Sequence, residues 1–361
     1  MQFLLVEPIA KTPYPPLGLM KISSMLKDNH PNCKVFDQIG NSAPNGLYNP
    51  EKIFITSLFT WDVDSVIDSI RYYQRKFPGV EILVGGISAT LIPEYITKRS
   101  GIIPRLHLYE PAEFYPPDYS VKFGRKLNTS MTMASRGCIR KCSFCTVTTL
   151  EPNFYCKNNW EKDINIDYPY ITFWDNNWLA SSNFESDIEK LIKFGKKVDF
   201  NQGLDARLYD EQKAKLLSKI NIDPIRFAFD DISYEKQVIK AIRTAKKYTN
   251  REIAVYVLYN HDDDTPEELY YRLNLLNNES VLVFPMEYRE PTPSKRKFPA
   301  KNWNTYLLRG FKLSTLFYYR KGMITAKRES FTSIYGNSAQ EFVNKLYKIY
   351  DYDKNLKRKK R

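Results

Sequence analysis

The chain has 361 residues, 43% of them hydrophobic, and a formal net charge of +13. This length is sufficient for two domains with their own cores, and no apolar run approaches the ~18 residues that a membrane span requires. The amino-terminal residues resemble a strand rather than a secretory signal. Five cysteines without an even framework are typical of a reducing compartment. We therefore expect a soluble, cytoplasmic protein that does not bind membranes.

Residues 1–125 alternate predicted strands and helices. Short apolar runs predict strands over residues 3–7, 34–37, 53–59 and 81–86. Helical spacing of apolar residues predicts helices over 18–26 and 62–77, the second with Asp62 as its N-cap. Strands that alternate with helices in this way predict a doubly wound parallel sheet of the flavodoxin or Rossmann kind. A connector over residues 104–119 is rich in proline and tyrosine, and we expect it to lack regular secondary structure.

Three of the five cysteines, Cys138, Cys142 and Cys145, lie in one short stretch with the spacing C-x3-C-x2-C. Thiolates favour zinc, copper(I) or iron–sulfur clusters. A structural zinc site usually takes four ligands as two separated pairs, whereas Cys33 and Cys156 are isolated singles. Three cysteines in one loop suit a [4Fe–4S] cluster that keeps one iron open. Chance clustering or a disulfide-prone loop is the alternative interpretation.

The segment from 126 to 290 repeats the alternation of strands and helices. Apolar runs predict strands over residues 129–134, 170–175, 198–202, 225–229, 253–259 and 281–285. Helical stretches such as 183–194 and 210–219 lie between them. About six strands, most of them followed by a helix, predict a partial (β/α)6 barrel of the TIM type, with ligands gathered at the carboxyl ends of its strands.

The cysteine spacing, with the aromatic Phe144 just before the last cysteine, resembles the cluster loop of the radical S-adenosylmethionine (SAM) superfamily. The resemblance implies that the three cysteines bind a [4Fe–4S] cluster and that SAM chelates its open iron. One-electron reduction, by a flavodoxin-like or ferredoxin-like partner, would then cleave SAM to methionine and a 5′-deoxyadenosyl radical that abstracts hydrogen from a substrate. The resemblance extends over roughly residues 1 to 290.

Two segments of the amino-terminal part, residues 15–20 and 84–90, resemble the cobalamin (B12)-binding-like domain that precedes many radical SAM barrels. The cobalt-ligating motif of that domain is D-x-H-x-x-G, and the nearest match, residues 37–40, has no histidine. Cobalamin would therefore bind without this ligand, and we favour a domain that has kept the fold and lost the cofactor. The glycines at 85 and 86 fit a plain strand-end turn as well as a ligand contact.

Polar residues at the end of the second barrel strand are candidate SAM contacts. Asp175, Asn176 and Asn177 lie where the superfamily usually places groups that hold the SAM amino nitrogen. A carboxylate and amide oxygens can accept hydrogen bonds from an ammonium group. An Asx turn would explain the same residues.

Further candidates follow the next two strands. Gln202, Asp205 and Arg207 end the third strand. Asp205 would accept from the ribose hydroxyls of SAM, and Arg207 would bind its carboxylate through two hydrogen bonds. A simple ion pair between these two residues is the alternative. Asp230 ends the fourth strand, where relatives often carry an acidic residue.

Residues 256–268 resemble the family strand that ends in G-x-P-x-E-T-x-E-E, with Asn260 in place of the glycine. The substitution puts adenine packing there in doubt. The acidic run 262–264 lacks the ligand spacing of a calcium loop, and we interpret it as the cap of a helix that begins at Pro266. The three histidines stand apart from one another and are interpreted as surface or packing residues.

Positive charge is concentrated in the carboxy-terminal segment, residues 291–361. Residues 289–328 hold eleven lysines and arginines against one acid, and the last eight residues add six bases. Seven aromatics interleave with the first group: Phe298, Trp303, Tyr306, Phe311, Phe317, Tyr318 and Tyr319. Bases with stacking aromatics predict a single-stranded nucleic-acid interface. An amphipathic helix over 306–319 that covers the barrel is the alternative. We expect the tail, 356–361, to be disordered.

Three functional hypotheses follow. The first is a radical SAM enzyme that modifies nucleic acid, either tRNA or DNA, and it explains the basic aromatic segment. The second is a radical SAM enzyme acting on a small molecule or peptide, which suits the cobalamin-domain resemblance. The third is a non-catalytic nucleic-acid-binding protein that carries an iron–sulfur cluster or zinc.

Overall fold

The computed structural model describes residues 1–294, 298–318, 323–324 and 327–359. The chain divides into two compact units. The first unit comprises residues 1–176 and 290–296, and the second comprises residues 177–289 and 297–361. The domain boundaries that we predicted near residues 125 and 290 stay predictions.

The first unit begins with a four-stranded sheet in the order β2-β1-β3-β4. The strands are β1 (Gln2–Glu7), β2 (Lys34–Ile39), β3 (Lys52–Thr56) and β4 (Glu81–Gly85). All neighbouring strands are parallel, with Gln2 paired with Lys34 and Lys52 paired with both Phe3 and Glu81. The predicted strands at these four places are confirmed.

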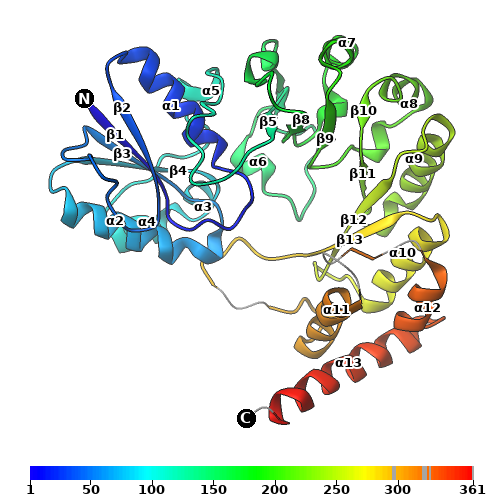
Figure 1. Ribbon diagram of the computed structural model, residues 1–361. Helices are drawn as coiled ribbons and strands as arrows, with labels where there is room; N and C mark the ends of the chain where they lie inside the picture. Colours follow the sequence, from blue (N-terminus) through cyan, green and yellow to red (C-terminus); the bar gives the residue numbers. More distant parts are fainter. Residues whose placement is uncertain (295–297, 319–322, 325–326, 360–361) are drawn as a thin grey trace. The chain divides into compact units, whose positions relative to one another are not determined.

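Helices cover both faces of this sheet, because alternate residues of β1 are apolar on both sides. Leu4 and Val6 pack into a cluster with α2 (Val63–Lys76), whereas Phe3 and Leu5 pack into a second cluster with α1 (Leu17–Asn29). Figure 1 shows α1 on one face and α2 and α4 on the other. The remaining elements here are η1 (Thr60–Asp62), α3 (Ile87–Leu91) and α4 (Pro93–Ser100).

Two sequence predictions for this part need correction. The connector contains a short helix, α5 (Glu110–Glu113), where we expected no regular structure. Pro111 stands in its first turn, the place where a helix tolerates proline. Asp62 occupies the N-cap position of α2, but its side chain does not cap the helix. Its carboxylate instead forms an ion pair with Lys11 at 2.6 Å.

The rest of the first unit contains two short strand pairs. β5 (Thr129–Thr132) pairs in parallel with β8 (Tyr170–Phe173), as the strand predictions at 129–134 and 170–175 anticipated. β6 (Ser135–Arg136) and β7 (Tyr155–Cys156) form an antiparallel pair that the sequence patterns did not reveal. α6 (Val147–Leu150) lies between these last two strands, and η2 (Trp160–Asp163) follows β7.

The second unit continues the alternation of strand and helix. β9 (Lys197–Phe200) and β10 (Asn221–Ile222) are parallel, and β11 (Ile225–Ala228), β12 (Ile253–Tyr259) and β13 (Leu282–Glu287) form a parallel three-stranded sheet. The helices between them are α7 (Phe184–Phe194), α8 (Glu211–Leu217), α9 (Glu235–Tyr248) and α10 (Pro266–Asn278). Single turns η3 (Trp178–Ala180), η4 (Ala206–Leu208) and η5 (Ile232–Tyr234) follow the strand ends or precede helices. The predicted strands and helices here are confirmed, except that β10 was not predicted.

The described part of the carboxy-terminal segment contains the helices α11 (Thr305–Tyr318), α12 (Arg328–Tyr335) and α13 (Ala339–Lys359). Phe311, Tyr335 and Phe342 are fully buried and bring one residue from each helix into a common core. The predicted amphipathic helix is confirmed as far as Tyr318, and Tyr319 lies outside the described residues. The predicted disorder of the tail is wrong for its first part, because α13 continues to Lys359.

Within the described ranges, no helix combines the length and the apolar character needed to cross a membrane.

Candidate functional site

The three clustered cysteines lie in the loop between β6 and α6. Cys138, Cys142 and Cys145 are all partly exposed thiols. A turn joins the last two, since the amide of Cys145 donates to the carbonyl oxygen of Cys142 at 3.1 Å. The amide of Arg140 donates to the Cys138 sulfur at 3.3 Å. Phe144, the aromatic that precedes the last cysteine, is half-buried in the same loop.

The donor set of this loop suits a soft metal centre, because it offers three thiols within eight residues. Among the residues that the structure describes, no group of three or more His, Cys, Asp or Glu side chains is already gathered as a metal-binding cluster. The loop therefore supplies the ligand chemistry of an iron–sulfur site, and the three cysteines stay predicted ligands.

The loop begins at Gly137, whose backbone conformation requires glycine. Its φ is +71°, and a Cβ there would lie 2.3 Å from the carbonyl oxygen of Asn153. The Gly137 amide donates to the Glu151 carboxylate at 2.6 Å. Glu151, which follows α6, thus binds Gly137 at the start of the loop. Neither Gly137 nor Glu151 was predicted as a site residue, since their contact depends on tertiary geometry.

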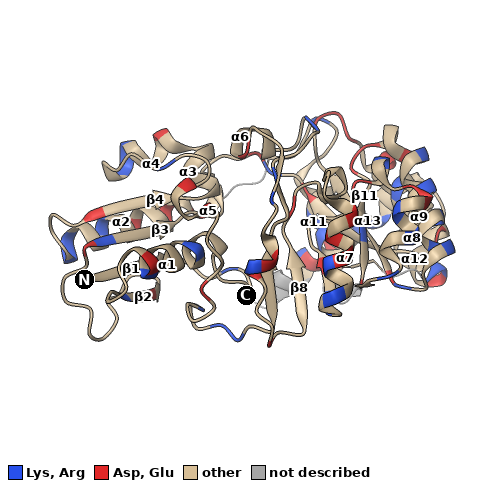
Figure 2. Cartoon of the chain, turned by 90° about the horizontal axis from the view of Figure 1, so that it is seen from above, with Lys and Arg blue, Asp and Glu red and all other residues tan. Residues whose placement is uncertain are grey.

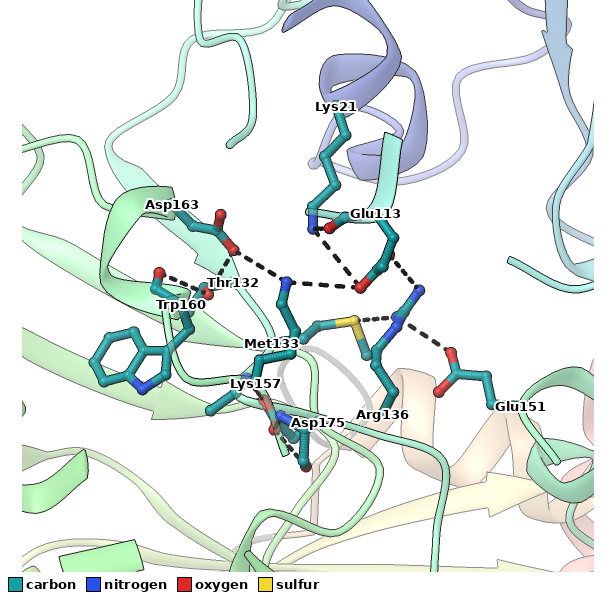
Figure 3. A network of polar contacts seen from close by, with 12 residues as sticks. Lys21, Glu113, Thr132, Met133, Arg136, Glu151, Lys157, Trp160, Asp163 and Asp175 are labelled. Atoms are coloured by element: carbon teal, nitrogen blue, oxygen red, sulfur yellow. Dashed lines mark hydrogen bonds and ion pairs between the residues drawn. The ribbon is translucent and has the colours of Figure 1, made fainter. Parts of the chain in front are cut away.

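Arg136, the residue before Gly137, lies in a buried network of charges that Figure 3 shows. Its guanidinium pairs with Glu113 at 3.2 Å and with Glu151 at 3.1 Å. Glu113 also pairs with Lys157 at 3.6 Å, and its carbonyl oxygen accepts from Lys21 at 2.8 Å. Burial lowers the pKa of the Lys21 ammonium to about 8. These pairs connect α1, the connector helix α5, β6 and the segment after β7.

Asp175 and Asn176 are directed toward the backbone and side chains around the cysteine loop. The buried Asp175 carboxylate accepts from the amide of Ala134 at 3.1 Å and from the hydroxyl of Ser135 at 2.6 Å. The Asn176 amide group donates to Glu151 at 3.2 Å. Asp175 therefore stabilises the chain that leads into the loop, and Asn176 holds the side chain of Glu151, which follows α6. Their predicted contact with the SAM amino group stays a prediction.

The second unit brings together most of the other predicted contacts. Asn177 donates to Asp205 at 3.1 Å, and the same carboxylate accepts from the Arg207 Nε at 2.7 Å. The Arg207 guanidinium also lies over the Tyr234 ring, 4.6 Å from its centre. The ion pair that we had considered as the alternative therefore forms. Gln202 is exposed.

Asp230 follows β11, and its carboxylate accepts from the amide of Leu258 at 3.2 Å. Burial raises the pKa of Asp230 to about 6, although the nearby Arg272 and Arg207 partly oppose the shift. Arg272, which was not predicted as a site residue, lies next to Asp230. It is 1% exposed, donates to the carbonyl oxygens of Phe229, Asp230 and Leu258, and pairs with Asp264 at 2.6 Å.

The backbone conformation just after β12 explains why Asn260 can stand in place of the glycine of the G-x-P-x-E-T-x-E-E pattern. Asn260 has a φ of +65°, in the left-handed region where asparagine is tolerated better than most residues. The predicted cap at 262–264 is wrong. Thr265 is the N-cap of α10 and forms a capping box with Glu268, whereas Asp264 pairs with Arg272. Asn260 thus has a backbone conformation that glycine also adopts readily.

The carboxyl edge of the amino-terminal sheet carries exposed apolar side chains. Ile9, Ile39, Leu58 and Ile87, each at or just after the end of a different strand, are 38–41% exposed. Gly86 lies at the same edge with a φ of +111°, and a Cβ there would lie 2.7 Å from the Ser57 carbonyl oxygen. In the incomplete cobalt-ligating motif, Asp37 accepts from the amide of Phe123 at 2.6 Å.

The aromatic residues of the basic segment divide into two groups. Trp303 and Phe311 are buried core residues, whereas Phe298 and Tyr306 are 61% and 49% exposed. The side chains of residues 317–319 lie outside the described part. Basic residues are also present elsewhere in the second unit, for example along α9 (Figure 2). The predicted nucleic-acid interface stays a prediction, with fewer aromatics available for stacking.

The three histidines contact neighbouring groups, as expected of packing residues. His30 stacks on Phe3 with ring centres 5.5 Å apart, and His261 meets the edge of Tyr288 at 4.5 Å. The His107 ring lies 3.3 Å from a backbone carbonyl oxygen.

Comparison with known proteins adds information about the fold. Neither a protein-family profile nor a curated protein matches the sequence. Two structures of the radical S-adenosylmethionine methyltransferase TsrM from Kitasatospora setae are similar. The structure with cobalamin and a [4Fe–4S] cluster bound has a TM-score of 0.63 and 12% identity over 87% of this chain and 75% of that chain.

The TsrM structure with tryptophan substrate and the SAM analogue aza-SAM bound has a TM-score of 0.61. It is 12% identical over 81% of this chain and 74% of that chain. The likeness shows a shared mixed α/β fold with parallel sheets. At this identity the likeness concerns the fold alone.

Proposed function

We propose that the protein is a radical SAM enzyme, with a flavodoxin-like, cobalamin-binding-like domain followed by a partial (β/α)6 barrel. The observation that carries the proposal is the C-x3-C-x2-C loop of Cys138, Cys142 and Cys145 in a chain with the TsrM fold. A likeness in fold alone does not specify an activity. The three thiols at the superfamily spacing add the chemistry.

The chain's own residues have separate roles in this proposal. The three cysteines hold a [4Fe–4S] cluster, and Arg140 and Lys141 between them offset part of the thiolate charge. When bound and reduced, such a cluster would supply the one electron needed to cleave SAM to methionine and a 5′-deoxyadenosyl radical, which would take hydrogen from the substrate. Arg207 binds the SAM carboxylate, and Asp205 and Tyr234 fix the orientation of its guanidinium.

The sequence favoured a domain that had lost cobalamin, but the exposed apolar residues at the carboxyl edge of the first sheet lead us to propose cobalamin as a further cofactor. Ile9, Leu58 and Ile87 offer a surface for the apolar face of a corrin ring. Gly86 lets the backbone of Ser57 lie close at the same edge. Ile39 stands where the motif has its histidine, so this motif supplies no imidazole. Equilibrium binding of hydroxocobalamin tests this part, and an Ile87→Glu variant should bind more weakly if the edge is the site.

The substrate class that we favour is nucleic acid, because Phe298 and Tyr306 stay exposed within the basic segment. Exposed aromatics beside lysine and arginine can stack on unpaired bases while the cations neutralise phosphates. Binding of single-stranded RNA or DNA should then weaken steeply with salt. A Tyr306→Ala variant should lose affinity. Salt-independent or absent binding would favour a small molecule or peptide as substrate.

The central experiment is anaerobic reconstitution with iron and sulfide, followed by addition of SAM and dithionite. The expected result is visible iron–sulfur absorbance and 5′-deoxyadenosine from the wild type. Cys142→Ala should lose both, whereas Cys33→Ala, which removes a cysteine outside the loop, should lose neither. S-adenosylhomocysteine as the sole product would indicate methyl transfer instead of radical cleavage. A bound cluster without any SAM turnover would favour the non-catalytic alternative, and absence of a cluster would contradict the proposal.

A further inference from the structure

We propose that Glu151 is a positioning residue that closes the base of the cysteine loop and holds it ready for a cluster. The inference rests on the proposed function, because it assumes that residues 138–145 carry the metal ligands. It concerns a residue outside the ligand motif, separated from the last cysteine by the helix α6.

The Glu151 carboxylate binds the residues that lead into the loop. One oxygen, Oε2, accepts from the Gly137 amide at 2.6 Å and from the Asn176 side chain at 3.2 Å. The other oxygen, Oε1, pairs with the Arg136 guanidinium at 3.1 Å. The Glu151 side chain is only 12% exposed, so water competes little for these contacts. One carboxylate thus joins the two residues that lead directly into Cys138.

The backbone at the same place independently shows that the loop base is closed. Gly137 approaches the chain after the loop so closely that a Cβ would lie 2.3 Å from the Asn153 carbonyl oxygen and 3.1 Å from that of Glu151. Tyr155, two residues after Asn153, pairs with Arg136 where β6 and β7 run antiparallel. The two ends of the segment from 137 to 151 are therefore in contact, and all three cysteines lie on the loop between them.

Arg136, the ion-pair partner of Glu151, is itself held in place by other charged residues. Arg136 pairs with Glu113 at 3.2 Å, and Glu113 pairs with Lys157 at 3.6 Å (Figure 3). The side chains of these three residues are only 6–12% exposed. A buried cation that lost one carboxylate would remain poorly compensated. The network therefore keeps the guanidinium in place, and through it the Glu151 carboxylate.

Closure of the loop base would help a cluster to bind in two ways. Three thiolates repel one another, and a loop with tied ends has less conformational entropy to lose when they converge. The carboxylate is also a negative charge beside the first ligand residue. Charge and hydrogen bonding around an iron–sulfur cluster set its reduction potential. Removing the carboxylate should therefore raise that potential.

The test compares the wild type with Glu151→Gln and Glu151→Ala, and Glu94→Gln on the exposed surface of α4 is the matched control. Glutamine keeps an oxygen that can accept from Gly137 but loses the charge that pairs with Arg136. In the protein without metal, limited trypsin digestion at Arg140 and Lys141 reports opening of the loop. We expect Glu151→Ala to be cut about tenfold faster than the wild type, the effect of losing one charged hydrogen bond, and Glu151→Gln to be intermediate.

In the reconstituted protein, the reduction potential and the EPR spectrum of the cluster are the second readout. Both Glu151 variants should show a more positive potential, whereas the Glu94 variant should match the wild type. Unchanged digestion rates and unchanged potentials in both variants would overturn the inference, as would equal acceleration in the Glu94 control. If the wild type takes up no cluster, the proposed function fails, and the digestion of the metal-free protein still decides whether Glu151 closes the loop.

Discussion

Replacement of Arg272 by methionine should destabilise the second unit strongly while leaving the first unit intact. The guanidinium donates to the carbonyl oxygens of Phe229 at 3.0 Å, Asp230 at 3.1 Å and Leu258 at 2.8 Å. It also pairs with Asp264 at 2.6 Å. Methionine is a good helix former of similar length, so the loss isolates the polar contacts. Removing one partner of a buried ion pair costs about 3–5 kcal/mol.

For a unit of this size, each 1 kcal/mol lowers the melting temperature by about 2–4 °C. We therefore expect a decrease of roughly 10 °C in the melting transition of the second unit, measured by calorimetry and by urea denaturation.

The matched control is Arg243→Met, which removes an exposed arginine of α9 and should leave the transition nearly unchanged. The double variant Arg272→Met with Asp264→Asn should be less destabilised than the sum of the single variants, because the second change removes the stranded carboxylate. Strict additivity, or an Arg272→Met protein within about 0.5 kcal/mol of the wild type, the range of ordinary surface substitutions, would refute this reasoning.

Three further results are expected. Gly310→Ala should destabilise the carboxy-terminal helices by about 1–3 kcal/mol, because the new Cβ would lie 2.2 Å from the Leu346 carbonyl oxygen. Gly18→Ala is the control and should leave the stability unchanged, because no atom lies within 4 Å of its Cβ position. Gly137→Ala should lose iron on reconstitution, because a side chain at a φ of +71° costs about 1–2 kcal/mol before any clash; wild-type iron content would contradict this. Burial raises the pKa of Asp230 to about 6. The Asp230 carboxyl group therefore binds its proton more tightly in the native state than in the unfolded chain. This contribution to the free energy of unfolding is lost as the pH rises through about 6. Asp230→Asn should gain stability relative to the wild type between pH 4 and pH 7.5 in urea unfolding, and a pH-independent difference would exclude the effect.

Local patterns in the sequence predicted the secondary structure well. The strands β1, β3, β4 and β12 are continuous apolar runs, which are typical of parallel strands buried on both faces. The misses were short elements such as β10 and α5, which are two and four residues long. Elements of that length carry too few residues for a periodicity to show.

The candidate site was predictable where its chemistry is local. The three cysteines form one motif within eight residues, and Asp205 and Arg207 are two positions apart. By contrast, the contact from Gly137 to Glu151 and the bonds from Arg272 to three strand-end carbonyls join residues that no spacing rule connects. The same holds for Arg136 and Glu113, which are separated by 23 positions.

The physical reason is the range over which each interaction acts. Apolar periodicity and ligand spacing depend on neighbours along the chain, so the amino-acid order alone specifies the strands, the helices and the cysteine loop. A buried charge depends on which partner the fold brings to it, because an unpaired charge in the interior is costly. Only the tertiary structure decides that Glu151 meets Gly137 and Arg136, and that Arg272 meets Asp264.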